Sequence, residues 1–251
     1  MYTRSYRHNS IKKIFPNIFF VTGVNQYIDD SGEQQHSRNM VIVRENDKLS
    51  LINTVRLTEE GLAELNSLGN VENIIRIGAF HGRDDAFYVE QYHAKLWAIP
   101  GMKHENNLIT DVELISNGPK PFADCSIFIF QSSKEPEGIL HVNRENGIII
   151  TCDSIKNWLE ADEFFSLKTA AVYEKAGFFG KATVSKIWRE HCQVDVSDFM
   201  KLDQFNFRHM LSAHGEPLLN IDKYCLLENI QHQYGQNNKY NNLLAYNREC
   251  D

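Results

Sequence analysis

Short apolar runs that alternate with polar turns are the feature that most constrains the fold of this chain. Residues 40–44 and 49–55 are rich in Val, Ile and Leu, and the polar stretch between them has the composition of a tight turn. Asn146-Gly147 favours a second hairpin turn, directly before the apolar run 148–151. The chain is therefore predicted to contain strands that pair locally.

Helical patterns separate these runs. Leu62, Leu65 and Leu68 have the spacing of one helix face, and Thr58 has the side chain of an N-cap. Further helices are predicted over 85–93, 184–191 and 196–203 and in the aromatic stretch after Asp153, and further strands over 14–21, 71–77, 95–99, 125–131 and 138–142. Strand pairs mixed with helices indicate two sheets packed face to face, with helices outside.

No Pro-, Gly- or Ser-rich linker divides the 251 residues, which predicts a single domain over 1–251. Residues 222–251 are expected to form a C-terminal extension, since they include an Asn/Gln-rich stretch. The formal net charge of −7 argues against nucleic acid as a partner. A small-molecule substrate or ligand that is anionic is compatible with this charge, because a local Arg or Lys can bind it.

The cysteines and the N-terminus indicate where the protein resides. The five cysteines include no C-x-x-C pair, which favours a reducing compartment over a disulfide framework. The apolar stretch 14–24 is interrupted by Pro16, Asn17 and Gly23, so neither a signal peptide nor a membrane span is expected. The prediction is a cytoplasmic protein without membrane contact. Aromatic pairs such as Phe164-Phe165 would suit a homodimer contact if they are exposed.

Three strand-like runs lead into side chains that can bind metal or take part in catalysis. The first is followed by His81, Arg83 and Asp85, the second by Asp153 and the third by His214. Side chains at strand ends are held on rigid elements and still reach solvent, as a functional site requires. Imidazole and carboxylate groups are natural ligands of zinc, iron and manganese.

The order of these segments resembles the metallo-β-lactamase fold superfamily. Its members have a strand, a helix and a strand that leads into a His-x-His-x-Asp-His motif, followed by later loops that supply an Asp and a His-Gly. Thr151-Cys-Asp153 is similar to the Asp segment and His214-Gly215 to the last loop, and the likeness runs from about residue 15 to about residue 220. The resemblance implies an α/β fold, a four-layer αββα sandwich of the metallo-β-lactamase type. On the matching positions it implies four metal ligands, His81, Asp85, Asp153 and His214.

Several expected ligands are absent, so the chain is similar to a divergent branch with an incomplete motif. With His81 on the first histidine, Arg83 stands in place of the second and Ala86 in place of the last. No histidine lies between 130 and 138, where the family usually supplies another. A shifted alignment, with His81 on the second histidine, puts Arg83 and Asp84 on the remaining positions and matches less well.

Two functional interpretations follow from this pattern. In the first, one divalent metal (zinc, iron or manganese) lowers the pKa of a bound water, Asp85 orients or deprotonates it, and Arg83 binds an anionic group. The protein is then a hydrolase of a small ester, thioester or phosphoester with a single-metal site. In the second, no metal binds, Arg83 pairs with Asp85 or Asp153, and the cleft of a non-catalytic protein binds a ligand or partner. The sequence leaves both open.

Overall fold

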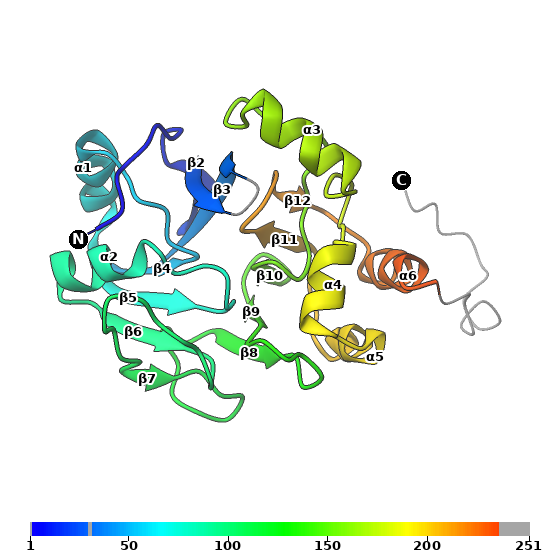
Figure 1. Cartoon of the computed structure of the whole chain (residues 1–251). Coiled ribbons are helices and arrows are strands. Elements are labelled where there is room, and N and C mark those ends of the chain that lie inside the picture. The colour runs from blue at the N-terminus through cyan, green and yellow to red at the C-terminus, as the bar shows by residue number, and fades with distance from the viewer. Residues whose placement is uncertain (1, 30–31, 236–251) are drawn as a thin grey trace.

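A computed structural model describes residues 2–29 and 32–235 of the chain. Two β-sheets lie at its centre, with helices around them (Figure 1). The first sheet contains seven strands in sequence order: β1 (Lys12–Phe15), β2 (Ile18–Asp29), β3 (Gly32–Glu45), β4 (Lys48–Ile52), β5 (Asn70–Arg76), β6 (Lys95–Ala98) and β7 (Val112–Glu113). Strands β1 to β4 pair antiparallel, and β4 to β7 pair parallel.

The second sheet has the strand order β12-β11-β10-β9-β8. Its strands are β8 (Cys125–Ile129), β9 (Gly138–Val142), β10 (Ile148–Thr151), β11 (His209–Ser212) and β12 (Leu218–Leu219). Strands β10 and β11 are parallel, and the other neighbours in this sheet are antiparallel. The parallel pair matters for the site, because both strands end at the same edge of the sheet.

Both faces of the first sheet are buried, and neighbouring residues of β2 show this because their side chains point to opposite faces. Ile18 and Phe20 of β2 point into the core between the two sheets, which they share with Leu140 and Ile150 of the second sheet. Phe19, the residue between Ile18 and Phe20, packs instead in a cluster with residues of helices α1 and α2. Successive side chains of a strand point to opposite faces, so an apolar run without alternation fits a sheet covered on both sides.

Helices complete two outer layers. Helices α1 (Glu59–Leu68) and α2 (Asp85–Tyr92) pack against the first sheet. Helices α4 (Lys186–Cys192), α5 (Val196–Met200) and α6 (Lys223–Gln233), with the 3-10 helix η1 (Lys201–Gln204), pack against the second. Helix α3 (Leu167–Lys175) lies beside β3, where Gln35 N donates to Thr169 Oγ1. The predicted αββα order is confirmed.

Three sequence predictions differ from the structure. The run 14–21 is a hairpin rather than one strand, because Asn17 adopts a left-handed conformation (φ 62°) between β1 and β2. Strand β3 extends well before residue 40, since its polar residues are buried and paired with β2. The aromatic stretch after Asp153 is not helical before residue 167.

The prediction of a single domain, with 222–251 as an extension, is not tested by the fold. Within that range α6 packs on the second sheet, and residues 236–251 lie outside the described residues. Cys225 is disulfide-bonded, which weakens the argument from cysteines for a fully reduced chain. Among the described residues, no helix combines the length and the apolar character needed to cross a bilayer.

Candidate functional site

The register of two parallel strands places Asp153 beside His214. Thr151, the last residue of β10, pairs with Ser212, the last residue of β11, and each candidate ligand lies two residues further on. The hydroxyls of Thr151 and Ser212 both donate to Ile155 O at 2.7 Å, which fixes the loop that carries Asp153. Ser212 Oγ also accepts from His214 N at 3.2 Å, so the same hydroxyl supports both loops.

The loop after β5 brings His81 to the same place, and Arg76 shapes that loop. The Arg76 guanidinium donates to Gly78 O at 3.4 Å and to Ala79 O at 2.7 Å. It also lies against Gly82, which has a φ of 144° and where a Cβ would come within 2.4 Å of Arg76 Cζ. Only glycine leaves this space, so the loop wraps around the guanidinium and turns His81 toward the second sheet.

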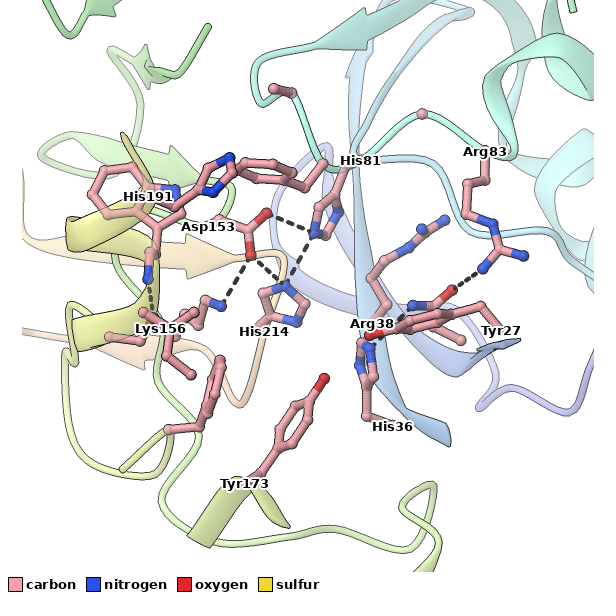
Figure 2. A pocket seen from close by; sticks show the side chains of 18 of the residues that line it. Tyr27, His36, Arg38, His81, Arg83, Asp153, Lys156, Tyr173, His191 and His214 are labelled. Carbon is pink, nitrogen blue, oxygen red and sulfur yellow. Dashed lines mark hydrogen bonds and ion pairs between the residues drawn. The ribbon is translucent and has the colours of Figure 1, made fainter. Parts of the chain in front are cut away.

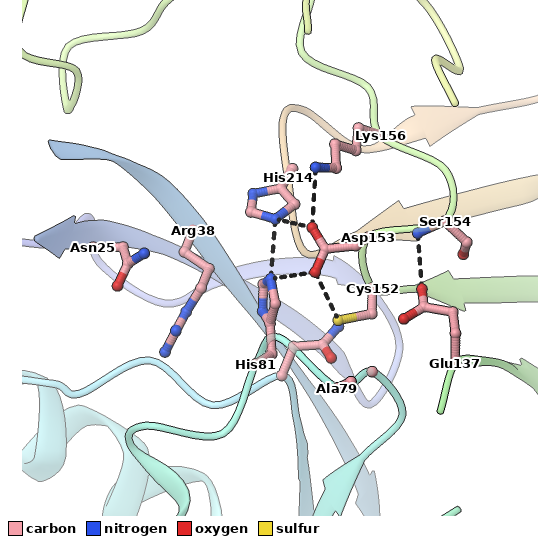
Figure 3. Close-up of polar contacts among 12 residues, drawn as sticks. Asn25, Arg38, Ala79, His81, Glu137, Cys152, Asp153, Ser154, Lys156 and His214 are labelled. Carbon is pink, nitrogen blue, oxygen red and sulfur yellow. Dashed lines mark hydrogen bonds and ion pairs between the residues drawn. The ribbon is translucent and has the colours of Figure 1, made fainter. Parts of the chain in front are cut away.

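His81, Asp153 and His214 form a compact buried cluster (Figure 3). His81 Nε2 lies 3.0 Å from His214 Nε2 and 3.2 Å from Asp153 Oδ2. His214 Nε2 lies 3.1 Å from Asp153 Oδ1. These are the residues predicted from the strand-end loops, and the structure brings three of the four predicted metal ligands together.

The three contacts of this cluster cannot all be favourable hydrogen bonds. An ionised carboxylate only accepts, so both His–Asp contacts require a proton on Nε2 of each ring. The two Nε2 groups, 3.0 Å apart, would then be two donors facing each other. Removing either proton leaves a nitrogen lone pair facing a carboxylate oxygen. A cation at the common point removes this conflict, because it takes lone pairs from all three side chains.

The donor set fits one divalent metal. Two imidazoles and a carboxylate are a frequent protein set at catalytic zinc, and a tetrahedral ion with bonds near 2.05 Å separates its ligands by about 3.3 Å. The two imidazole nitrogens lie 3.0 Å apart, and each lies 3.1 to 3.2 Å from a different oxygen of Asp153, which is close to this value. However, Nδ1 of both His81 and His214 is buried without a partner in the described part of the chain. Metal-bound histidines usually donate this second N–H to an acceptor, so we expect the metal affinity to be modest.

Lys156 competes for the same carboxylate. Its Nζ lies 3.0 Å from Asp153 Oδ1, and both side chains are less than a tenth exposed. Burial alone would raise the pKa of Asp153, but the Lys156 ammonium and the two imidazoles hold it well below its usual value. Burial lowers the pKa of His81 and of His214, so both rings are neutral at pH 7. Neutral imidazole is the form that binds metal.

Asp85 and Arg83 lie outside the cluster. Asp85 begins helix α2 and accepts from Thr54 Oγ1 at 2.6 Å, while burial raises the pKa of its carboxyl. Arg83 NH1 donates to Asn25 Oδ1 and Gln26 O, both at 3.2 Å. The expected pairing of Arg83 with Asp85 or Asp153 is therefore absent among the described residues. Lys156 provides the cation that the sequence analysis assigned to Arg83.

A pocket of about 780 Å³ opens onto the cluster and includes residues that the sequence analysis did not identify (Figure 2). Lys156 follows Asp153 by three residues, and this closeness to a predicted ligand was the sequence feature that could have identified it as a site residue. His36 and Arg38 come from the unpredicted part of β3, and Arg76 ends β5. Trp158 lies 4.4 Å from His214 between ring centres. The polar residues of β3 carried no pattern by which sequence alone could have placed them here.

His36 gives the site a testable pH dependence. Its Nδ1 donates to Ser37 O at 2.9 Å, its Nε2 accepts from Asn25 at 3.1 Å, and burial lowers its pKa from 6.5 to about 3. As the pH falls, the unfolded chain therefore binds a proton at His36 before the folded chain does, and this favours unfolding. The folded protein keeps its full stability above about pH 6.5 and loses stability progressively as the pH falls from 6.5 toward 3. The variant His36→Gln has no imidazole at this position to protonate, so it should not lose stability in this way. Between about pH 7 and pH 5 the difference in unfolding free energy between wild type and variant should change by about 2 kcal/mol, in favour of the variant.

Urea unfolding with EDTA at the two pH values measures this difference. The other titrating groups near the site, including Glu137, whose pKa is raised by burial, are present in both proteins and cancel to first order. A difference that does not change with pH would mean that His36 binds its proton equally in the folded and unfolded states.

The structure is similar to solved metallo-β-lactamases over nearly its whole length. VMB-1 at pH 5.5 matches with a TM-score of 0.60 and 16% identity, covering 92% of this chain and 97% of that chain. FIM-1 from Pseudomonas aeruginosa, in a mono-zinc form, matches with a TM-score of 0.59 and 13% identity over 90% and 94% of the two chains. A metallo-β-lactamase from Pontibacter korlensis matches with a TM-score of 0.59 and 13% identity over 91% and 99%. No protein-family model and no curated protein matches the sequence.

Proposed function

Because the chain has the metallo-β-lactamase fold, we propose that it is a metal-dependent hydrolase with a single-metal site. The proposed substrates are small esters, thioesters or phosphoesters, and the proposed ion is zinc, iron or manganese. The observation that carries the proposal is the convergence of His81, Asp153 and His214, whose donor atoms all lie within 4.8 Å of one another. Their contacts conflict without a cation and are compatible with one.

The residues of the chain have distinct parts in this proposal. His81, His214 and Asp153 hold the ion, which supplies a Lewis acid and lowers the pKa of a bound water. Lys156 and Arg83 lie at the pocket and attract an anionic part of the substrate. Asp85 was predicted to orient the water, but its carboxylate accepts a hydrogen bond from Thr54 and lies outside the cluster. Asp85 therefore has no part in the proposed reaction.

One observation favours a second candidate function. The Lys156 ammonium already neutralises Asp153 at 3.0 Å, as a metal would. A metal-free protein that binds a ligand or partner in the same pocket would keep this ion pair permanently. Neither candidate function includes binding of nucleic acid, because the net charge of the chain is −7. The homodimer stays a prediction.

Metal content separates the two candidates. Protein purified from medium with added zinc or manganese should contain about one equivalent of metal by elemental analysis. His81→Ala and His214→Ala should each lower this content to near zero, because two remaining ligands hold an ion weakly. The exposed His232 on α6 provides a matched control. His232→Ala should keep the wild-type content.

Hydrolysis of para-nitrophenyl acetate, phenyl thioacetate and para-nitrophenyl phosphate should then depend on the metal and stop with EDTA. Wild-type protein that takes up no metal, even from excess, contradicts the hydrolase and supports the metal-free ligand-binding protein. Metal uptake that survives His81→Ala and His214→Ala would place the ion elsewhere and also contradict the proposal.

A further inference from the structure

The geometry points to a ligand that joins an anionic group to a flat apolar ring. This inference deepens the proposed function, on which it rests for the reaction, because it names the class of compound that enters the pocket. The pocket of about 780 Å³ lies within the size range of small-molecule sites. It is lined by strands of the first sheet, by the loops that follow β5, β10 and β11, and by α3 and α4.

The lining of the pocket is cationic although the chain is acidic. Among the residues that the structure describes, Arg38, Arg76, Arg83 and Lys156 line it, with two acids, Glu105 and Asp153. The chain as a whole has a net charge of −7. Charges of one sign gathered in a cleft raise the local concentration of ligands of the opposite sign. The pocket therefore selects anions from solution.

Arg83 is the cation available to bind such an anion. Arg38 pairs with Asp84 at 2.6 Å, and Lys156 pairs with Asp153 at 3.0 Å. The Arg76 guanidinium donates to loop carbonyls. Arg83, by contrast, donates to neutral oxygens, Asn25 Oδ1 and Gln26 O, and has no carboxylate partner among the described residues.

A guanidinium presents a planar fork of donors that matches a carboxylate or a phosphate. Arg83 uses NH1 for its two protein contacts, and it is only partly buried. Its remaining donors have no hydrogen-bond partner in the described part of the chain, so they are open to a ligand. The amide of Asn25 and the ring of Tyr27, 5.7 Å from Arg83 Cζ, hold the side chain in place at the pocket wall.

Aromatic rings form the opposite part of the pocket. Tyr173 and Phe178 are stacked, with ring centres 4.4 Å apart and planes at 21°. Trp158 lies 5.9 Å from Tyr173 and also contacts His214. Flat faces of this kind bind planar apolar groups. The side chains of Phe80 and Ile187 are about half exposed at the same pocket, at 47% and 52%, which extends its apolar surface toward solvent.

The two parts line the same pocket as the cluster. Figure 2 shows Arg83 on one side of His81 and His214, with Lys156 on the other side and Tyr173 facing the pocket from α3. A ligand whose anion binds Arg83 and whose ring reaches Tyr173 would lie in the pocket that the His81–Asp153–His214 cluster also lines. The proposed metal and such a ligand would then share one pocket.

Binding of four probes to the full chain tests this inference by calorimetry: naphthoate, naphthylphosphonate, neutral naphthamide and inorganic phosphate. We expect naphthoate or naphthylphosphonate to bind at least about tenfold more tightly than naphthamide, since a charged hydrogen bond distinguishes them. The stronger of the two identifies the anion as carboxylate or phosphate. Inorganic phosphate, which lacks the ring, should bind at least about tenfold more weakly than naphthylphosphonate.

Variants separate the two halves of the ligand. Arg83→Gln should remove the preference for anions and leave naphthamide binding unchanged, while Arg83→Lys should keep part of the preference. Tyr173→Ala should weaken naphthoate and naphthamide alike. Arg208→Gln, an exposed arginine that does not line the pocket, should change nothing. Equal binding of naphthoate, naphthylphosphonate and naphthamide, or an anion preference that survives Arg83→Gln, overturns the inference.

The same titrations on EDTA-treated protein and on His81→Ala distinguish this inference from the proposed function. An anion preference that persists in EDTA-treated protein and in His81→Ala supports the ligand class independently of the metal. Wild-type protein that shows this preference but takes up no metal, even from excess, supports the ligand class and contradicts the hydrolase. Metal uptake and hydrolysis without any anion preference contradict the ligand class and leave the hydrolase standing.

Discussion

Replacing Asp153 with asparagine is expected to lower the unfolding free energy of the metal-free protein by about 3 kcal/mol at neutral pH. The Asp153 carboxylate is the partner of Lys156 in the described structure, at 3.0 Å, and the Lys156 side chain is only 6% exposed. An asparagine of the same shape leaves this ammonium buried without a counter-charge. Removal of one partner from a buried ion pair typically costs about 3 to 5 kcal/mol.

A double-mutant cycle separates the charge effect from the shape effect. Lys156→Met removes the ammonium and keeps most of the volume, so Asp153→Asn with Lys156→Met should recover much of the lost stability. The measurement is urea unfolding of the four proteins with EDTA. Additive losses in the double variant would show that Lys156 and Asp153 are not coupled, and the metal-free alternative would lose its main support.

The cycle also bears on the metal. Lys156 lies against a carboxylate that the proposed ion needs, and a positive charge at this place opposes the binding of a cation. Lys156→Met should therefore tighten metal binding, while Asp153→Asn should abolish it. The two single variants thus have opposite expected effects on metal binding.

The late half of the site could be predicted from sequence because local rules determine it. Strands 138–142 and 148–151 were predicted with the bounds of β9 and β10. Asn146-Gly147 marked the turn, and both residues have a positive φ in the structure. Once β10 and β11 pair in parallel, Asp153 and His214 must lie side by side. The resemblance to the fold superfamily supplied the expectation that Asp153 and His214 serve one site, and the structure supplied the strand pairing.

The parts that the sequence did not reveal depend on contacts between distant segments. Arg83 and Lys156 are both cations close to predicted ligands, and only the path of each loop decides which of them reaches Asp153. Arg76 holds the loop from Gly78 to Gly82 so that Arg83 points toward Asn25 of β2. Trp158 and Tyr173 come from separate segments, so no single helix or strand pattern relates them. The sequence therefore did not predict that they meet at the pocket.

Loss of the Arg38–Asp84 ion pair is expected to have the largest effect on stability of any single change discussed. Arg38 NH2 lies 2.6 Å from Asp84 Oδ2, and the two side chains are 2% and 11% exposed. Asp84 also accepts from Arg56 N at 3.0 Å, and Arg38 donates to Thr54 O. Asp84→Ala should therefore lower the unfolding free energy by about 3 to 5 kcal/mol, because it leaves a buried guanidinium unpaired and frees the segment before α2.

A surface pair provides the matched control. Lys48 Nζ lies 2.9 Å from Glu72 Oε2, but these side chains are 54% and 44% exposed. Water solvates each charge when its partner is removed, so Glu72→Ala should leave unfolding close to wild type in the same urea experiment. Arg38→Met with Asp84→Ala should be more stable than Asp84→Ala alone, since it removes the unpaired charge. Because the two pairs differ little in distance and greatly in burial, a similar loss for Asp84→Ala and Glu72→Ala would mean that burial of the charge is not what makes Asp84 important.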